Sequence, residues 1–169
     1  SHFGPPESDE HGERGLHGLI SNQPAEIETI VQPDPFQGKM EMSITGRIRE
    51  TRVFGPSFEL RRTISGTVGE PVIRVHDEVI NLANTPQPHM ILYHCNFGWP
   101  LADEGADILW KGSWDTPQGK EDKIFREGNN FRKCSAPLDI HKGGGEAVAF
   151  IDPDAAPDGT CSCGLYNEK

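Results

Sequence analysis

The sequence has few basic residues, no long apolar run and no sustained helical periodicity. Its 16 Lys and Arg are outnumbered by 26 Asp and Glu, so the net charge is −10. Binding to phosphates needs a cationic surface, and this balance argues against nucleic-acid or membrane partners. No apolar run approaches the ~18 residues of a membrane span, and the first residues lack the pattern of a signal peptide. We therefore expect a cytoplasmic protein.

Cysteine is also scarce, with four residues in the chain. A secreted disulfide scaffold is shorter and denser in cysteine. Cys161 and Cys163 form a C-x-C motif, but a structural zinc site needs a second ligand pair at zinc spacing, which is missing. We expect Cys95, Cys134, Cys161 and Cys163 to be reduced thiols, and we expect no metal site.

Glycine and proline are abundant instead. The 19 Gly and 14 Pro residues make up about a fifth of the chain, against a usual ~12%. That density of helix breakers argues against a helical bundle. Eight Phe and three Trp favour a folded core over disorder.

Alternation of apolar and polar residues predicts β-strands, because side chains on a strand point to opposite faces in turn. The pattern occurs at Met40–Thr45, Phe58–Arg61, Ile64–Val68, Val72–His76, Glu78–Leu82, Met90–Phe97 and Ala147–Ile151, and Cys163–Asn167 resembles the start of another strand. The fold class predicted is all-β, an antiparallel β-sandwich of about eight to twelve strands. We expect one β domain over residues 1–169, with residues 1–15 as an extended arm.

Two histidine-containing stretches are candidates for chemistry. His17 has glycines close by, which carry no side chain to screen it; a loop histidine bonded to backbone is the alternative. His94 begins the stretch His94-Cys95-Asn96-Phe97-Gly98-Trp99-Pro100-Leu101. Sugar sites combine a flat aromatic side chain with imidazole and amide groups that bond hydroxyls. A core histidine satisfied by a neighbour is the alternative for His94.

A third stretch is His141-Lys142-Gly143-Gly144-Gly145-Glu146, just ahead of a predicted strand. Its triple glycine is weak support for a phosphate-binding loop, because the Gly-Lys-Ser/Thr ending and the following helix are missing. A flexible turn that leaves Glu146 at the mouth of the strand is the plainer interpretation.

These stretches, in this order, resemble the galactose mutarotase (aldose 1-epimerase) superfamily, and most closely its bacterial branch of aldose 1-epimerase family proteins. The motifs are Gly15-Leu16-His17-Gly18 with Ile20-Ser21-Asn22, and Leu92–Leu101 with Asp103-Glu104-Gly105. The second block is the more specific. The resemblance covers nearly the whole chain, which corresponds to the middle part of a family member.

The resemblance implies a large antiparallel β-supersandwich that interconverts the anomers of a sugar without a cofactor. It implies that His94 is the general acid, that His17 positions the substrate and that Glu146 binds sugar hydroxyls. Imidazoles titrate near ~6.5 and suit proton donation at neutral pH. Further candidates for lining or supporting the cleft are Asn22, Asn96, Asp103 and Glu104. The C-terminal block that carries the family's catalytic Glu has no counterpart here.

Two other classes of function stay open at this point. One is a carbohydrate-binding module that keeps the cleft without the chemistry, which the missing base favours. The other is a structural β-domain whose histidines are ordinary core or surface residues. Unpaired strand edges also make a homodimer a possible assembly.

Overall fold

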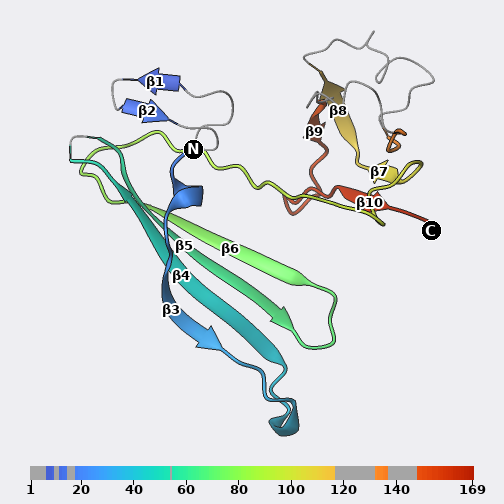
Figure 1. Ribbon diagram of the computed structural model, residues 1–169, viewed down its shortest axis with the longest axis horizontal. Helices are drawn as coiled ribbons and strands as arrows, with labels where there is room; N and C mark the ends of the chain where they lie inside the picture. The colour runs from blue at the N-terminus through green and yellow to red at the C-terminus, as the bar shows by residue number, and fades with distance from the viewer. Residues whose placement is uncertain (1–6, 10–11, 15–17, 54, 117–131, 137–147) are drawn as a thin grey trace. The chain divides into compact units, whose positions relative to one another are not determined.

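The computed structural model describes residues 7–9, 12–14, 18–53, 55–116, 132–136 and 148–169. The chain divides into two compact units, Ser1–Tyr93 and His94–Lys169, which are taken in turn. Apart from two short 3-10 helices, η1 (Ile20–Asn22) and η2 (Pro35–Gln37), the regular structure of the described residues is β, and every strand pair is antiparallel (Figure 1). The predicted all-β, antiparallel class is confirmed.

A four-stranded sheet with the order β3-β4-β5-β6 dominates the first unit. Consecutive strands are neighbours, as expected where short turns join antiparallel strands. A separate pair of short strands lies within residues 7–14, in the stretch expected to be an extended arm. The strands are β1 (Glu7–Asp9), β2 (Gly12–Arg14), β3 (Glu26–Val31), β4 (Glu41–Thr51), β5 (Ser57–Thr67) and β6 (Ile73–Asn81).

Two strands are each longer than the sequence pattern predicted. Phe58–Arg61 and Ile64–Val68 belong to the single strand β5, and β6 likewise joins two predicted strands. In the sequence, Arg62 interrupts the alternation of apolar and polar residues in β5, and Asp77 interrupts it in β6. These two residues are paired directly across β5 and β6, where Arg62 donates two hydrogen bonds of 2.7 Å to the Asp77 carboxylate. Each charge compensates the other, so both strands continue through the break.

The two faces of this sheet differ in chemistry, as a layer of a sandwich requires. On one face the cross-strand neighbours Ile44, Ile64 and Val75 align. On the other face Thr45 and Thr63 are paired, with their hydroxyl oxygens 2.9 Å apart. The sheet therefore has one apolar face, which also carries the Arg62–Asp77 pair, and one polar face.

The predicted strand Met90–Phe97 is wrong. This stretch forms no β-ladder with any described strand, although its apolar and polar residues alternate. A strand needs a hydrogen-bonding neighbour, and side-chain contacts hold the segment instead. The Tyr93 hydroxyl donates a 2.7 Å hydrogen bond to Asp77, and the ring of His89 lies 5.9 Å from that of Phe58. Alternation along that strand would have placed His94 and Asn96 on one face, and without the strand this arrangement has no support.

The second unit contains two pairs of short strands, β7 with β10 and β8 with β9. Its described core centres on Ala106 and Trp110, which are 2% and 6% exposed. The Arg132 guanidinium lies 3.8 Å from the centre of the Trp110 ring and donates a 2.8 Å hydrogen bond to its carbonyl. Strand β9 overlaps the predicted Ala147–Ile151, and β10 the predicted start of a strand. The strands are β7 (Asp107–Leu109), β8 (Gly112–Asp115), β9 (Phe150–Pro153) and β10 (Gly164–Tyr166).

Within the described ranges, none of the helical segments has the length and apolar character needed to cross a membrane. The expectation of a single β domain over residues 1–169 stays a prediction.

Gly112, at the start of β8, is expected to tolerate no side chain. Its φ is +131°, and an added Cβ would overlap the carbonyl oxygen of Asp152 on β9. Gly112→Ala should therefore destabilise the β8–β9 pair by about 2 kcal/mol or more, from strain and steric overlap together. Urea unfolding measures the loss. Gly164→Ala is the matched control, because its Cβ would meet Leu109 at an ordinary 3.9 Å. Equal stability of the two variants would contradict the prediction.

The Arg62–Asp77 pair should make stability depend on pH in the acid range. The hydrogen bond from Arg62 lowers the pKa of Asp77 below its ordinary value of 3.8. A lowered pKa in the folded state adds stability above about pH 3.8, and that stability is lost as the pH falls through the lower, folded-state value. Urea unfolding between pH 7 and pH 2 should show a decline that Asp77→Asn flattens. An unchanged decline in the variant would assign the effect to other carboxyls.

Candidate functional site

The His94 stretch begins the second unit and is open to solvent. His94 and Asn96 are both exposed, and so are the aromatic residues Phe97 (61%) and Trp99 (80%). Large exposed aromatics in succession are unusual in a stretch without regular structure, since burying each ring would be favourable. Exposure of this kind is suited to stacking on the apolar face of a flat ligand.

The loop that follows is fixed by its own backbone. The Ala102 N–H donates to the Gly98 carbonyl at 2.9 Å, and the Ala106 N–H donates to the Asp103 carbonyl at 3.0 Å. Gly105 takes a φ of +84°, in the left-handed region that favours glycine, and lets the chain turn into the buried Ala106. The loop 98–106 is thus a defined turn attached to the core of the second unit.

Residues 167–169 form side-chain contacts with this loop. Asn167 donates a 2.6 Å hydrogen bond to the Pro100 carbonyl, although the two residues are 67 positions apart. The Lys169 ammonium lies 2.9 Å from the Asp103 carboxylate. Pairing of β10 with β7 brings residues 167–169 to the loop. We call the contacts of Asn167 and Lys169 with loop 98–106 the tail clamp.

The tail clamp separates the roles of the two neighbouring acidic residues. Lys169, and then the Glu104 N–H, hold the pKa of the Asp103 carboxyl below its ordinary value. Asp103 is therefore an ionised carboxylate that is already bonded. The side chain of Glu104 is exposed and forms no ion pair with a described residue. Of the two, Glu104 is the one available to a ligand.

Three other residues predicted for the site are not part of the His94 stretch. His17 and Glu146 lie outside the described residues. Asn22 ends η1 in the first unit, where it is exposed and its N–H donates to the Leu19 carbonyl. Sequence reasoning missed Asn167 and Lys169. No sequence signal marks them, since only the pairing of β10 with β7 brings them to the loop.

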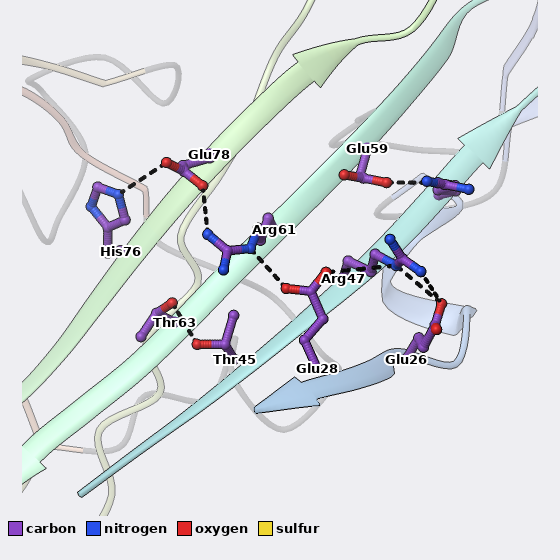
Figure 2. A network of polar contacts seen from close by, with 10 residues as sticks. Glu26, Glu28, Thr45, Arg47, Glu59, Arg61, Thr63, His76 and Glu78 are labelled. Carbon is purple, nitrogen blue, oxygen red and sulfur yellow. Dashed lines mark hydrogen bonds and ion pairs between the residues drawn. The ribbon is translucent and has the colours of Figure 1, made fainter. Parts of the chain in front are cut away.

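The polar face of the four-stranded sheet carries a network of charges (Figure 2). Arg47 and Arg61 lie directly opposite each other on β4 and β5, which would be repulsive by itself. A register shift in β3 between Ile27 and Thr29 places Glu28 beside both, 2.8 Å from Arg61 and 3.7 Å from Arg47. This irregularity supplies the carboxylate that the two arginines need.

The rest of the network extends this pairing across the sheet. Glu26 lies 3.0 Å from Arg47, and Glu78 lies 3.1 Å from Arg61. Arg49 and Glu59 form a further pair at 2.6 Å. Arg61 lowers the pKa of Glu28, and the pKa values of both Arg47 and Arg61 are raised. Because these shifts all come from mutual pairing, the network is a solvated face that fixes the strand register.

The described residues contain no group of three or more His, Cys, Asp or Glu side chains arranged to hold a metal ion. All four cysteines are free thiols, of which Cys95, Cys161 and Cys163 are exposed. The strongest candidate in the described residues is therefore the stretch from His94 to Glu104.

Comparison with known proteins assigns a family. Residues 1–169 match the family described as "Domain of unknown function (DUF4432)". The chain belongs to this family. No curated protein and no solved structure shows a significant match to it. Since the family's description names no activity, the resemblance to aldose 1-epimerases stays a prediction from the sequence motifs.

Removal of the tail clamp should change the ionisation of Asp103. In Lys169→Ala the carboxylate loses its ammonium partner, so its pKa should rise toward the ordinary value of 3.8. Carbon-detected NMR titration of the Asp103 carboxyl measures the change. Lys111→Ala removes a lysine from the same unit without touching Asp103 and should leave the titration unchanged. The tail clamp would be refuted by identical Asp103 titrations in the wild type and Lys169→Ala.

Proposed function

We propose that the protein is an aldose 1-epimerase-type isomerase that interconverts the anomers of an aldose or a sugar derivative. One observation carries the proposal: an exposed histidine leads directly into exposed aromatic side chains and a fixed loop with an available carboxylate. The motifs that resemble aldose 1-epimerases lie in this same stretch. Aromatic stacking with polar groups at the ring edge is a common mode of sugar binding.

In this mechanism His94 donates a proton to the ring oxygen of the sugar, while a carboxylate takes the proton of the anomeric hydroxyl. The bond between the ring oxygen and C1 breaks, and the open-chain aldehyde forms. Rotation about C1–C2 presents the other face of the carbonyl, and the reverse proton transfers close the ring as the other anomer. No electrons are exchanged with a second reactant, so the reaction needs no redox cofactor.

The structure suggests different roles for the surrounding residues. Trp99 offers the largest exposed ring for stacking on the sugar, and Asn96 offers an amide for its hydroxyls. Asp103 is engaged by Lys169 and supports the loop. The resemblance places the general base in a block that this sequence does not contain. Glu104 is the described carboxylate to test in its stead, because its side chain is exposed and bears no ion pair with described residues.

His94→Gln should slow anomer exchange by about 10²-fold or more, because the amide cannot donate the proton that general acid catalysis requires. NMR exchange spectroscopy on the anomeric protons of several aldoses measures the rate, with and without the protein. Gln87→Ala, a change at a half-buried residue outside the His94 stretch whose amide bonds only locally to Thr85 among the described residues, is the control and should leave the rate unchanged. A rate unaffected by His94→Gln would remove His94 from the mechanism.

The same assay tests which carboxylate is the general base. Glu104→Gln should abolish exchange if this carboxylate accepts the anomeric proton. If the base lies in the C-terminal block, exchange should instead require a chain extended beyond Lys169 and should survive Glu104→Gln in it. Absence of exchange from both the 169-residue chain and the extended one, over the whole panel of aldoses, would reject the isomerase.

A sugar-binding module without chemistry is the second candidate. It is favoured by the engagement of Asp103 in the tail clamp, which leaves fewer groups to move protons. Calorimetric titration with the same aldoses separates the two functions, since a binding module releases heat on binding but does not accelerate exchange. In that case Trp99→Ala should abolish binding, because the stacking surface is lost.

A further inference from the structure

The hydrogen bonds of the tail clamp form a continuous path along the loop that it contacts. The Asn167 amide nitrogen donates to the Pro100 carbonyl at 2.6 Å, and the Lys169 N–H donates to the Asn167 amide oxygen at 3.1 Å. The Lys169 ammonium donates to Oδ2 of Asp103 at 2.9 Å, and the Glu104 N–H donates to Oδ1 of the same carboxylate at 2.8 Å. The path therefore runs from Pro100 through the tail to Glu104.

This path joins two parts of the loop that the backbone leaves separate. One turn is closed by the hydrogen bond from Ala102 to Gly98, and the next by the hydrogen bond from Ala106 to Asp103. In the part of the chain that the structure describes, no backbone hydrogen bond connects the first turn with the second. The tail reaches both turns, at Pro100 in the first and at Asp103 in the second.

The tail is itself anchored where the loop ends. Tyr166 of β10 pairs with Asp107 of β7. Asn167 follows Tyr166, and Asp107 follows Ala106, which is 2% exposed. Since the two strands are antiparallel, the tail and the loop leave the strand pair at the same end. The reach of the tail to the loop is therefore short and is set by the register of β7 and β10.

We infer that Asn167 and Lys169 are positioning residues that hold Trp99 and Glu104 in one arrangement on the loop. Pro100 directly follows Trp99, whose side chain is 80% exposed. A side chain with so few packing neighbours takes its place from the backbone that carries it. All of these residues belong to the second unit. The inference rests on the proposed function, in which Trp99 stacks on the sugar while polar groups meet the edge of the sugar ring.

Asn167→Asp tests the inference, because it removes the donor to the Pro100 carbonyl and keeps an oxygen for the N–H two positions on. The matched control is Asn81→Asp in the first unit. The Asn81 amide also donates to a backbone carbonyl, that of Thr85, and also accepts from the N–H two positions on, that of Ala83. The two variants therefore make the same chemical change in the same kind of local contact.

The anomer-exchange assay, in whichever of the two chains is active, gives the first readout. Asn167→Asp should raise KM about 5-fold, because a neutral hydrogen bond contributes about that factor to an equilibrium. It should leave kcat nearly unchanged, because stacking on Trp99 stabilises the bound sugar and the transition state alike. Asn81→Asp should change neither constant.

A second readout does not depend on any activity. The backbone N–H resonance of Trp99 is identified by its disappearance in Trp99→Phe, and that of Glu104 by its disappearance in Glu104→Gln. Asn167→Asp should lower the heteronuclear NOE of the Trp99 amide, and Lys169→Met should lower that of the Glu104 amide, because each change removes a link to the tail. Asn81→Asp should change neither value. Urea unfolding confirms that the variants are folded under the conditions of the measurement.

The outcomes separate the inference from the proposed function. Lowered NOE values in the tail variants, with no exchange from either chain over the whole panel of aldoses, would uphold the positioning of the loop and reject the isomerase. Unchanged NOE values in both tail variants would overturn the inference whether or not the protein is active. Exchange with an unchanged KM in Asn167→Asp, or with an equal rise of KM in Asn81→Asp, would also overturn it.

Discussion

The ion pair between Arg62 and Asp77 places two charges on the apolar face of the four-stranded sheet. Asp77 depends on this pairing, because its side chain is only 4% exposed and a buried charge without a partner is unfavourable. Their direct opposition on β5 and β6 keeps both strands continuous. The same carboxylate also accepts a hydrogen bond from the Tyr93 hydroxyl, so this cross-strand pair binds a residue that lies beyond the sheet in the sequence.

Charge pairing is also what organises the opposite face of the sheet. Arg47 and Arg61 face each other, and the irregularity in β3 brings Glu28 between them. The chain has a net charge of −10, yet the sheet combines several arginines with carboxylates at hydrogen-bonding distance. Register is specified by these pairs on one face and by apolar contacts on the other, which makes a slip by one residue costly on both.

The candidate site depends on contacts of another kind. The loop after Trp99 is fixed by backbone hydrogen bonds and by the tail clamp, in which Lys169 engages Asp103. A carboxylate used in this way is a structural element, whereas its neighbour Glu104 stays available. Two adjacent acidic residues that look equivalent in the sequence therefore differ in the structure, because Asp103 pairs with Lys169 and the Glu104 side chain forms no ion pair with a described residue.

The sequence by itself determined the all-β class, the places of β4, β5, β6, β9 and β10 and the motif around His94. These follow from local chemistry: alternation, turn residues and the grouping of imidazole, amide and aromatic side chains. The tertiary structure decided the rest, since the continuity of β5 and β6, the absence of a strand at Met90–Phe97 and the contacts of Asn167 and Lys169 all depend on partners distant in the chain. A local pattern shows which face a residue prefers. Only the folded chain shows which partner it meets.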